Sequence, residues 1–200
     1  MNLEVEAKFQ IDDLAAVKAR LLALGGKITK ARIYEKNTVY DDAAESLKNS
    51  QRLIRLRQDE KIKLTFKGPA PAEVERLTEA KVREEIELEV ADFDKMEQII
   101  GRLGYSPAVV YEKYRETIQM GEVEAVLDEL PYGNFVELEG SESPIKALAA
   151  DCEIAWETRL NTNYLSLLRQ VITTYQFEFS DLTFANFEGR PVDWGKVLQA

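Results

Sequence analysis

Short stretches of this chain alternate charged and apolar residues with a period of two, and this pattern constrains the fold more than any other feature. The first stretch, EVEAK, spans residues 4–8. Successive side chains of a strand point to opposite faces, so Glu4, Glu6 and Lys8 would share one face while Val5 and Ala7 share the other. Such alternation predicts a half-buried antiparallel strand with one charged side.

Seven later stretches repeat the pattern, which predicts eight strands in all. Asp59 and Glu60 alone separate two of them, and this spacing predicts a hairpin with a two-residue loop. The later strands are expected at residues 33–41, 52–58, 61–68, 82–90, 111–119, 122–130 and 135–140.

Helical periodicity separates the strands. Residues 12–25 open on Asp12, a good N-cap, and end at Gly25, and residues 92–104 run in the same way from Asp92 to Gly104. Two more helices are expected at about 144–153 and 161–175. The aromatic segment 176–200 lacks a clear element, so we expect a docked tail there.

An internal repeat organises these elements. Glu4 and Glu6 precede a helix ending in Leu-Gly, as do Glu85 and Glu87 in the second half. We therefore expect an α+β fold: an eight-stranded antiparallel closed β tunnel made of two β-α-β-β-β halves, with helices packed outside. The tunnel domain would span residues 1–175, and 176–200 would form a tail of unknown role.

Composition excludes several classes of function. The 200 residues contain no histidine and a single cysteine, Cys152, which excludes a disulfide framework, a Cys/His zinc site and imidazole catalysis. A net charge of −10 argues against general nucleic-acid or anionic-membrane binding. No long apolar run or secretory signal is evident, so we expect a cytoplasmic protein.

The charged rows allow two interpretations. A half-buried sheet normally has one solvated polar face, which needs no function. Here, however, basic residues concentrate on some strands and acidic residues on others, and eight strands can close so that the polar face becomes a lumen. A lumen lined by unpaired charges is costly, so it favours a charged ligand. Arg and Lys suit phosphate oxygens, whereas carboxylates suit a hard cation such as Mg²⁺ or Mn²⁺.

These residues resemble the CYTH superfamily, the triphosphate tunnel metalloenzymes, which include class IV adenylyl cyclases, thiamine triphosphatases and inorganic triphosphatases. The E-x-E-x-K motif of residues 4–8 is short, but the ordered set that follows it is specific. That set consists of Arg55 and Arg57, Lys67 in LTFKG, Arg83 with Glu85 and Glu87, Lys113 and Arg115, Asp128 in VLD, and Glu137 and Glu139.

The resemblance implies a role for each matched residue. Catalysis would involve Glu4, Glu6 and Lys8. Triphosphate would bind to Lys8, Arg55, Arg57, Lys63, Lys67, Arg83, Lys113 and Arg115. Metal, Mg²⁺ or Mn²⁺, would bind to Glu4, Glu6, Glu85, Glu87, Asp128, Glu137 and Glu139.

The expected activity is metal-dependent hydrolysis of an inorganic or organic triphosphate by metal-activated water. The alternatives are a class IV adenylyl cyclase, which makes cyclic AMP and pyrophosphate from ATP, and a non-catalytic polyphosphate-binding module. A cyclase needs an apolar slot for adenine. The candidate side chains for such a slot are expected to be mostly core residues; they are Tyr34, Tyr40, Tyr105 and Tyr111.

The expected partner is a small molecule (tripolyphosphate, thiamine triphosphate or ATP), not nucleic acid or membrane, and a homodimer is the default assembly.

Overall fold

The structure, a computed structural model, describes residues 3–75 and 79–198, with side chains for 5–73 and 79–198. Its strands are β1 (Leu3–Ile11), β2 (Lys27–Asp41), β3 (Leu53–Gln58), β4 (Ile62–Pro69), β5 (Lys81–Val90), β6 (Ser106–Met120), β7 (Val123–Leu130) and β8 (Gly133–Glu139). Its helices are α1 (Leu14–Ala23), α2 (Ser46–Asn49), α3 (Ala72–Glu75), α4 (Phe93–Arg102), α5 (Glu142–Asp151), the 3₁₀ helix η1 (Trp156–Thr158), α6 (Tyr164–Tyr175), α7 (Phe184–Phe187) and α8 (Trp194–Leu198).

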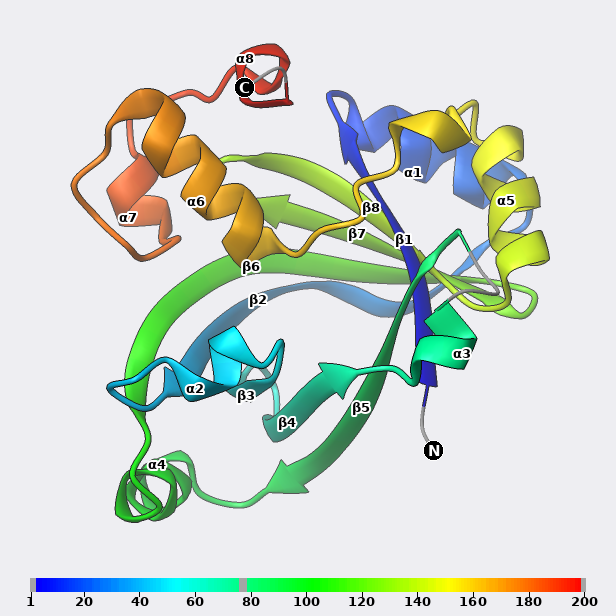
Figure 1. Cartoon of the computed structure of the whole chain (residues 1–200). Helices are drawn as coiled ribbons and strands as arrows, with labels where there is room; N and C mark the ends of the chain where they lie inside the picture. Colours follow the sequence, from blue (N-terminus) through cyan, green and yellow to red (C-terminus); the bar gives the residue numbers. More distant parts are fainter. Residues whose placement is uncertain (1–2, 76–78, 199–200) are drawn as a thin grey trace.

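The eight described strands close into an antiparallel barrel in the order β1-β5-β4-β3-β2-β6-β7-β8. The helices lie outside this ring (Figure 1). The first half of the chain contributes β1, α1 and β2–β4, and the second half contributes β5, α4 and β6–β8. The first strands of the two halves pair with each other, β1 with β5, and so do the second strands, β2 with β6. The predicted closed tunnel of two β-α-β-β-β halves is therefore confirmed.

Local details differ from the sequence predictions. The β3–β4 loop has three residues, not two, because Gln58 pairs with Ile62 and the Lys61 amide donates to Asp59 Oδ1 at 2.9 Å. Asp13, not Asp12, caps α1, since its carboxylate accepts from the Ala16 amide at 2.9 Å. Strand β2 begins at Lys27, well before residue 33, because bulges between residues 28 and 33 interrupt its alternation.

The two later helices are also shifted from their predicted bounds. Helix α5 spans Glu142–Asp151, two residues earlier than predicted. Helix α6 starts at Tyr164 and not at residue 161, because the Asn163 side chain accepts from the Ser166 amide and so caps the helix at that point. Both helices exist as expected, and the start of α6 is set by its capping side chain.

Three apolar clusters attach the helices to the outside of the barrel. Helices α1 and α5 pack on Phe9, Ile118 and Leu138, whereas α4 packs on Tyr40 and Leu56. Helices α6, α7 and α8 cover the third cluster, on β6–β8. Among the described residues, no helix combines the length and apolar character that a membrane span requires. Because apolar side chains use the outer face of the strands, the polar side chains are directed inward.

The described part of the tail, residues 176–198, docks on the outside of the barrel. Leu182 forms a parallel bridge to Tyr111 of β6, and the Trp194 indole donates to the Tyr132 carbonyl at 2.9 Å. Gly133 has φ +149°, and a Cβ at this position would lie 2.5 Å from the Trp194 indole nitrogen, so the contact requires glycine. A domain boundary at residue 175 stays a prediction.

Candidate active site

The barrel interior contains a cavity of about 440 Å³ lined mainly by ionic side chains. The whole chain carries −10. Among the described lining residues, however, ten are cationic and seven anionic, which leaves a formal charge of +3. The charged lining consists of Glu6, Lys8, Lys30, Glu35, Arg55, Arg57, Lys63, Lys67, Lys81, Arg83, Glu85, Glu87, Lys113, Arg115, Glu124, Glu137 and Glu139.

The predicted site residues converge on this cavity. Of those with described side chains, only Asp128 is not part of the lining. Arg83 lines the cavity and donates to the Gln51 carbonyl at 2.6 Å. Glu4 pairs with Arg83 through its backbone, but its side chain lies outside the described residues. The structure thus assembles the predicted set, whereas the role of each member stays a prediction.

Three carboxylates gather where β1 meets β8. Glu6 pairs in register with Glu139, and ligand oxygens of Glu6, Glu137 and Glu139 lie within 4.8 Å of one another. We call these three residues the acidic cluster. Burial raises the pKa of Glu137, but the charges of Lys8 and Arg115 outweigh burial and hold the pKa well below its usual range. Ionised oxygens at this spacing fit a hard divalent cation such as Mg²⁺ or Mn²⁺.

Lys8 lies next to the acidic cluster and is almost fully buried. Its Nζ is 3.0 Å from a Glu137 oxygen, donates to the Thr162 carbonyl at 3.3 Å and lies 3.7 Å from the centre of the Tyr164 ring. The segment before α6 is also tied to β1, because the Leu160 amide donates to the Lys8 carbonyl at 2.7 Å. Lys8 is thereby held by groups that are far apart in the sequence.

Cationic side chains line the opposite side of the cavity, on the two strands that flank β2. Strand β2 lies four strands from β1 in either direction around the ring, so it faces the acidic cluster across the barrel. Arg55 donates to the Tyr111 hydroxyl at 2.9 Å and to Thr65 Oγ1 at 3.1 Å. These hydrogen bonds hold its guanidinium in one orientation. We define the basic wall as Arg55 and Arg57 of β3 with Lys113 and Arg115 of β6.

Asp128 lies behind the basic wall, fully buried. It accepts from Lys113 at 3.0 Å, from Arg115 at 2.7 and 2.5 Å, and from the Tyr164 hydroxyl at 2.8 Å. Arg115 also donates to Glu137 at 2.6 Å, which links the basic wall to the acidic cluster. Asp128 is not a member of the acidic cluster, although it and Glu137 accept from the same Arg115 nitrogen, and both oxygens of Asp128 already accept hydrogen bonds. In this arrangement it positions cations and does not face the cavity.

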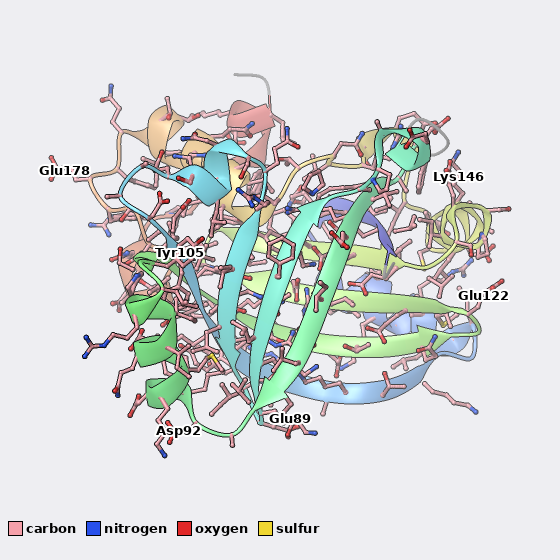
Figure 2. All side chains as sticks on the ribbon, turned by 60° about the horizontal axis from the view of Figure 1, so that its bottom comes forward. Glu89, Asp92, Tyr105, Glu122, Lys146 and Glu178 are labelled. Atoms are coloured by element: carbon pink, nitrogen blue, oxygen red, sulfur yellow. The ribbon has the colours of Figure 1, made fainter. Side chains whose placement is uncertain are left out.

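The β4–β5 side of the cavity alternates acids and bases in pairs. Lys63 donates to Glu87 at 2.6 Å, and Lys67 lies 2.9 Å from Glu85. Burial raises the pKa of Glu87, but Lys63 and Arg57 outweigh it and lower the pKa. Glu85 and Glu87 do not belong to the acidic cluster. Glu89, the next residue of the same row, lies at the rim of the molecule (Figure 2).

Comparison with known proteins identifies the family. The model of the CYTH domain matches residues 2–170. The chain belongs to the CYTH family. A relative from Methanocaldococcus jannaschii, named provisionally as an adenylate cyclase, is 32% identical over 145 residues, which cover 72% of this chain and 79% of the relative.

Solved structures share the fold. A protein from Vibrio parahaemolyticus, provisionally named an adenylate cyclase, has a TM-score of 0.74 at 18% identity, with 84% of this chain and 98% of that chain covered. A Hippeastrum protein, provisionally named an adenylyl cyclase and described as having a dominant triphosphatase activity, has a TM-score of 0.58 at 17% identity, with 84% and 95% covered. The expected enzyme class, a cyclase or a triphosphatase, matches the names of the relatives.

Some cavity residues of this CYTH chain were missed in the sequence. Glu35 and Lys81 continue the period-two rows of their strands, so the alternation could have identified them. Lys30 follows a bulge that breaks the alternation. Tyr164 belongs to a helix, and nothing in its local pattern shows that its ring packs against Lys8 inside the barrel.

Proposed function

We propose that this CYTH chain is a divalent-metal-dependent triphosphatase that cleaves the terminal anhydride of a short triphosphate. The single observation that carries this proposal is the cavity's charge pattern: the described lining residues sum to a formal charge of +3, and the acidic cluster faces the basic wall across the barrel. Tripolyphosphate that carries one divalent ion has a charge of about −3 when fully ionised, so such a ligand would neutralise the lining.

The protein's own residues would orient the phosphate chain. Arg55 and Arg57 would bind its oxygens from one side of β2, and Lys113 and Arg115 from the other. Asp128 and the Tyr164 hydroxyl hold Lys113 and Arg115 in place before substrate arrives. Because phosphoryl transfer depends on positioning and charge neutralisation, this fixed wall would stabilise charge that develops on the leaving diphosphate.

Glu6, Glu137 and Glu139 would hold the divalent ion, and Glu4 would join them if its side chain follows the alternation of β1. When bound, the ion would supply charge neutralisation at the phosphate oxygens and activation of water. Lys8, 3.0 Å from Glu137, would keep that carboxylate oriented and offset part of the negative charge next to the phosphate chain.

Adenylyl cyclase activity is the second candidate, favoured by the name of the 32% identical relative. It would require a slot for adenine and ribose. Leu53 and Leu165 are the aliphatic side chains among the described lining residues, and Tyr111 also lines the cavity, where its hydroxyl accepts a hydrogen bond from Arg55. Tyr34, instead, contacts Tyr114 and is 39% exposed. This limited apolar lining ranks cyclisation below hydrolysis.

A direct assay separates the two activities. The purified chain is incubated with Mg²⁺ or Mn²⁺ and tripolyphosphate, thiamine triphosphate or ATP. We expect orthophosphate from at least one of the first two substrates, and none when EDTA is added. Cyclic AMP and pyrophosphate from ATP, without orthophosphate from the other substrates, would instead establish the cyclase.

Glu6→Gln tests the acidic cluster. Because the substitution removes one anionic ligand and keeps the side-chain shape, we expect metal-dependent turnover to fall at least 100-fold. Calorimetric titration with Mn²⁺ alone should show correspondingly weaker binding. Glu89→Gln is the matched control, since Glu89 lies at the rim and pairs with Lys61. Equal turnover and Mn²⁺ binding in Glu6→Gln and wild type would remove Glu6 from the site.

A further inference from the structure

The cationic side of the cavity also contains a carboxylate, Glu35. Glu35 of β2 is fully buried, and its strand runs between the two strands that carry the basic wall. Its oxygens lie 3.7 Å from Lys113 Nζ, 3.7 Å from Lys30 Nζ and 3.9 Å from Arg57 NH1. All three separations exceed the hydrogen-bond range, so Glu35 acts on these cations through its charge and not through fixed hydrogen bonds.

Polar atoms without hydrogen-bond partners concentrate around Glu35. Within the described residues, the buried side-chain nitrogen and oxygen atoms of this kind are both oxygens of Glu35, both amide atoms of Asn37, and Nε of Arg55 and Arg57. Asn37 pairs in register with Arg57, so these groups form one continuous section of the β2–β3 wall. Buried polar atoms are costly unless a polar ligand or water meets them, and three of these four residues, Glu35, Arg55 and Arg57, line the cavity.

The charge of Glu35 is maintained by its surroundings. Burial raises its pKa, but the charges of Lys113, Arg115, Arg57 and Arg55 outweigh burial and hold the pKa at about 2. The carboxylate is thus anionic at neutral pH and subtracts one charge from the wall that would bind phosphate.

We propose that Glu35 is an affinity-limiting residue: its fixed negative charge weakens the binding of polyphosphate anions to the basic wall. The inference rests on the proposed function and deepens it, since it names the residue that sets how tightly the phosphate chain is held. Without Glu35, the cations would have one anionic neighbour fewer in the unliganded protein and would bind phosphate oxygens more strongly. A product such as pyrophosphate would then leave more slowly.

The expected size of the effect follows from the distances. A phosphate oxygen hydrogen-bonded to Arg57 or Lys113 would lie within about 7 Å of the Glu35 carboxylate, since each cation is under 4 Å from it. At an effective dielectric constant of about 20, one unit charge at this distance changes an affinity by about 10- to 100-fold.

Isothermal titration of tripolyphosphate in EDTA tests the proposal, because it measures binding without metal or turnover. We expect Glu35→Gln to lower the Kd at least tenfold and Glu35→Asp, which keeps the charge, to stay within about threefold of wild type. Glu129→Gln is the matched control. Glu129 is also a strand glutamate, but it pairs with Arg32 at the surface, so its removal should leave the Kd unchanged.

Asn37→Asp supplies the opposite change, since it adds a carboxylate to the same wall, and should raise the Kd about tenfold or more. It keeps the test decisive if Glu35→Gln fails to fold. An unchanged or higher Kd in folded Glu35→Gln, or an unchanged Kd in Asn37→Asp, would overturn the inference and leave the triphosphatase proposal intact. If wild type binds no tripolyphosphate in EDTA or with Mg²⁺, both proposals fail together.

Discussion

Asp128 and Glu35 are both fully buried, and they lie on strands that flank β6 on its two sides, yet they are bonded in opposite ways. Asp128 accepts hydrogen bonds from Lys113, Arg115 and Tyr164. Glu35 has cations nearby but no hydrogen-bond partner. Burial alone therefore does not define the role of an acid: Asp128 is a structural anchor, whereas Glu35 is a fixed charge next to the ligand space.

The largest expected difference between the two acids is in stability. Asp128→Asn leaves Lys113 and Arg115 buried next to a neutral amide, and breaking such a pair costs about 3–5 kcal/mol. Urea denaturation at pH 7 measures the loss. A loss under about 1 kcal/mol would mean that Asp128 is not the anchor that its hydrogen bonds indicate.

Glu35→Gln should show a smaller stability loss that depends on pH. The folded pKa of Glu35, about 2, lies below the ordinary value of 4.5, so its charge stabilises the fold above pH 4.5 and this contribution disappears as the pH falls toward 2. We expect the free energy of unfolding of wild type to exceed that of Glu35→Gln by about 3 kcal/mol at pH 7. The difference in the free energy of unfolding between the two proteins should decrease as the pH falls from 4.5 to 2. Glu129→Gln, measured in parallel, should differ little from wild type at pH 7.

Tyr164→Phe should produce the smallest effect. It removes one hydrogen bond to Asp128 but leaves the ring over Lys8, so the free energy of unfolding should fall by about 1–2 kcal/mol. Chemical denaturation of the single variants and of the double variant Tyr164→Phe/Asp128→Asn gives the coupling between the two side chains. Strict additivity would show that the hydroxyl does not support Asp128.

Period-two alternation was sufficient to predict most of the barrel. It placed eight strands, assigned inward faces to Glu6, Arg57 and Lys113, and revealed the two-fold repeat. It missed the start of β2, because bulges between residues 28 and 33 shift the pairing with β6. The residues at these bulges are ordinary strand residues, so the sequence does not mark them. The sequence also did not separate two adjacent aspartates as caps of α1, where the structure shows that Asp13, and not Asp12, accepts from the Ala16 amide.

Sequence by itself determined which side chains share a face, since that follows from backbone geometry within one strand. Partners across the barrel were decided by the tertiary structure. Closure of the ring brings Glu6 to Glu139, and the packing of α6 directs Tyr164 to Asp128. Neither contact is local in sequence. Whether an acid faces other carboxylates, a hydrogen-bond donor or a more distant cation therefore depended on how the strands closed, which local periodicity does not encode.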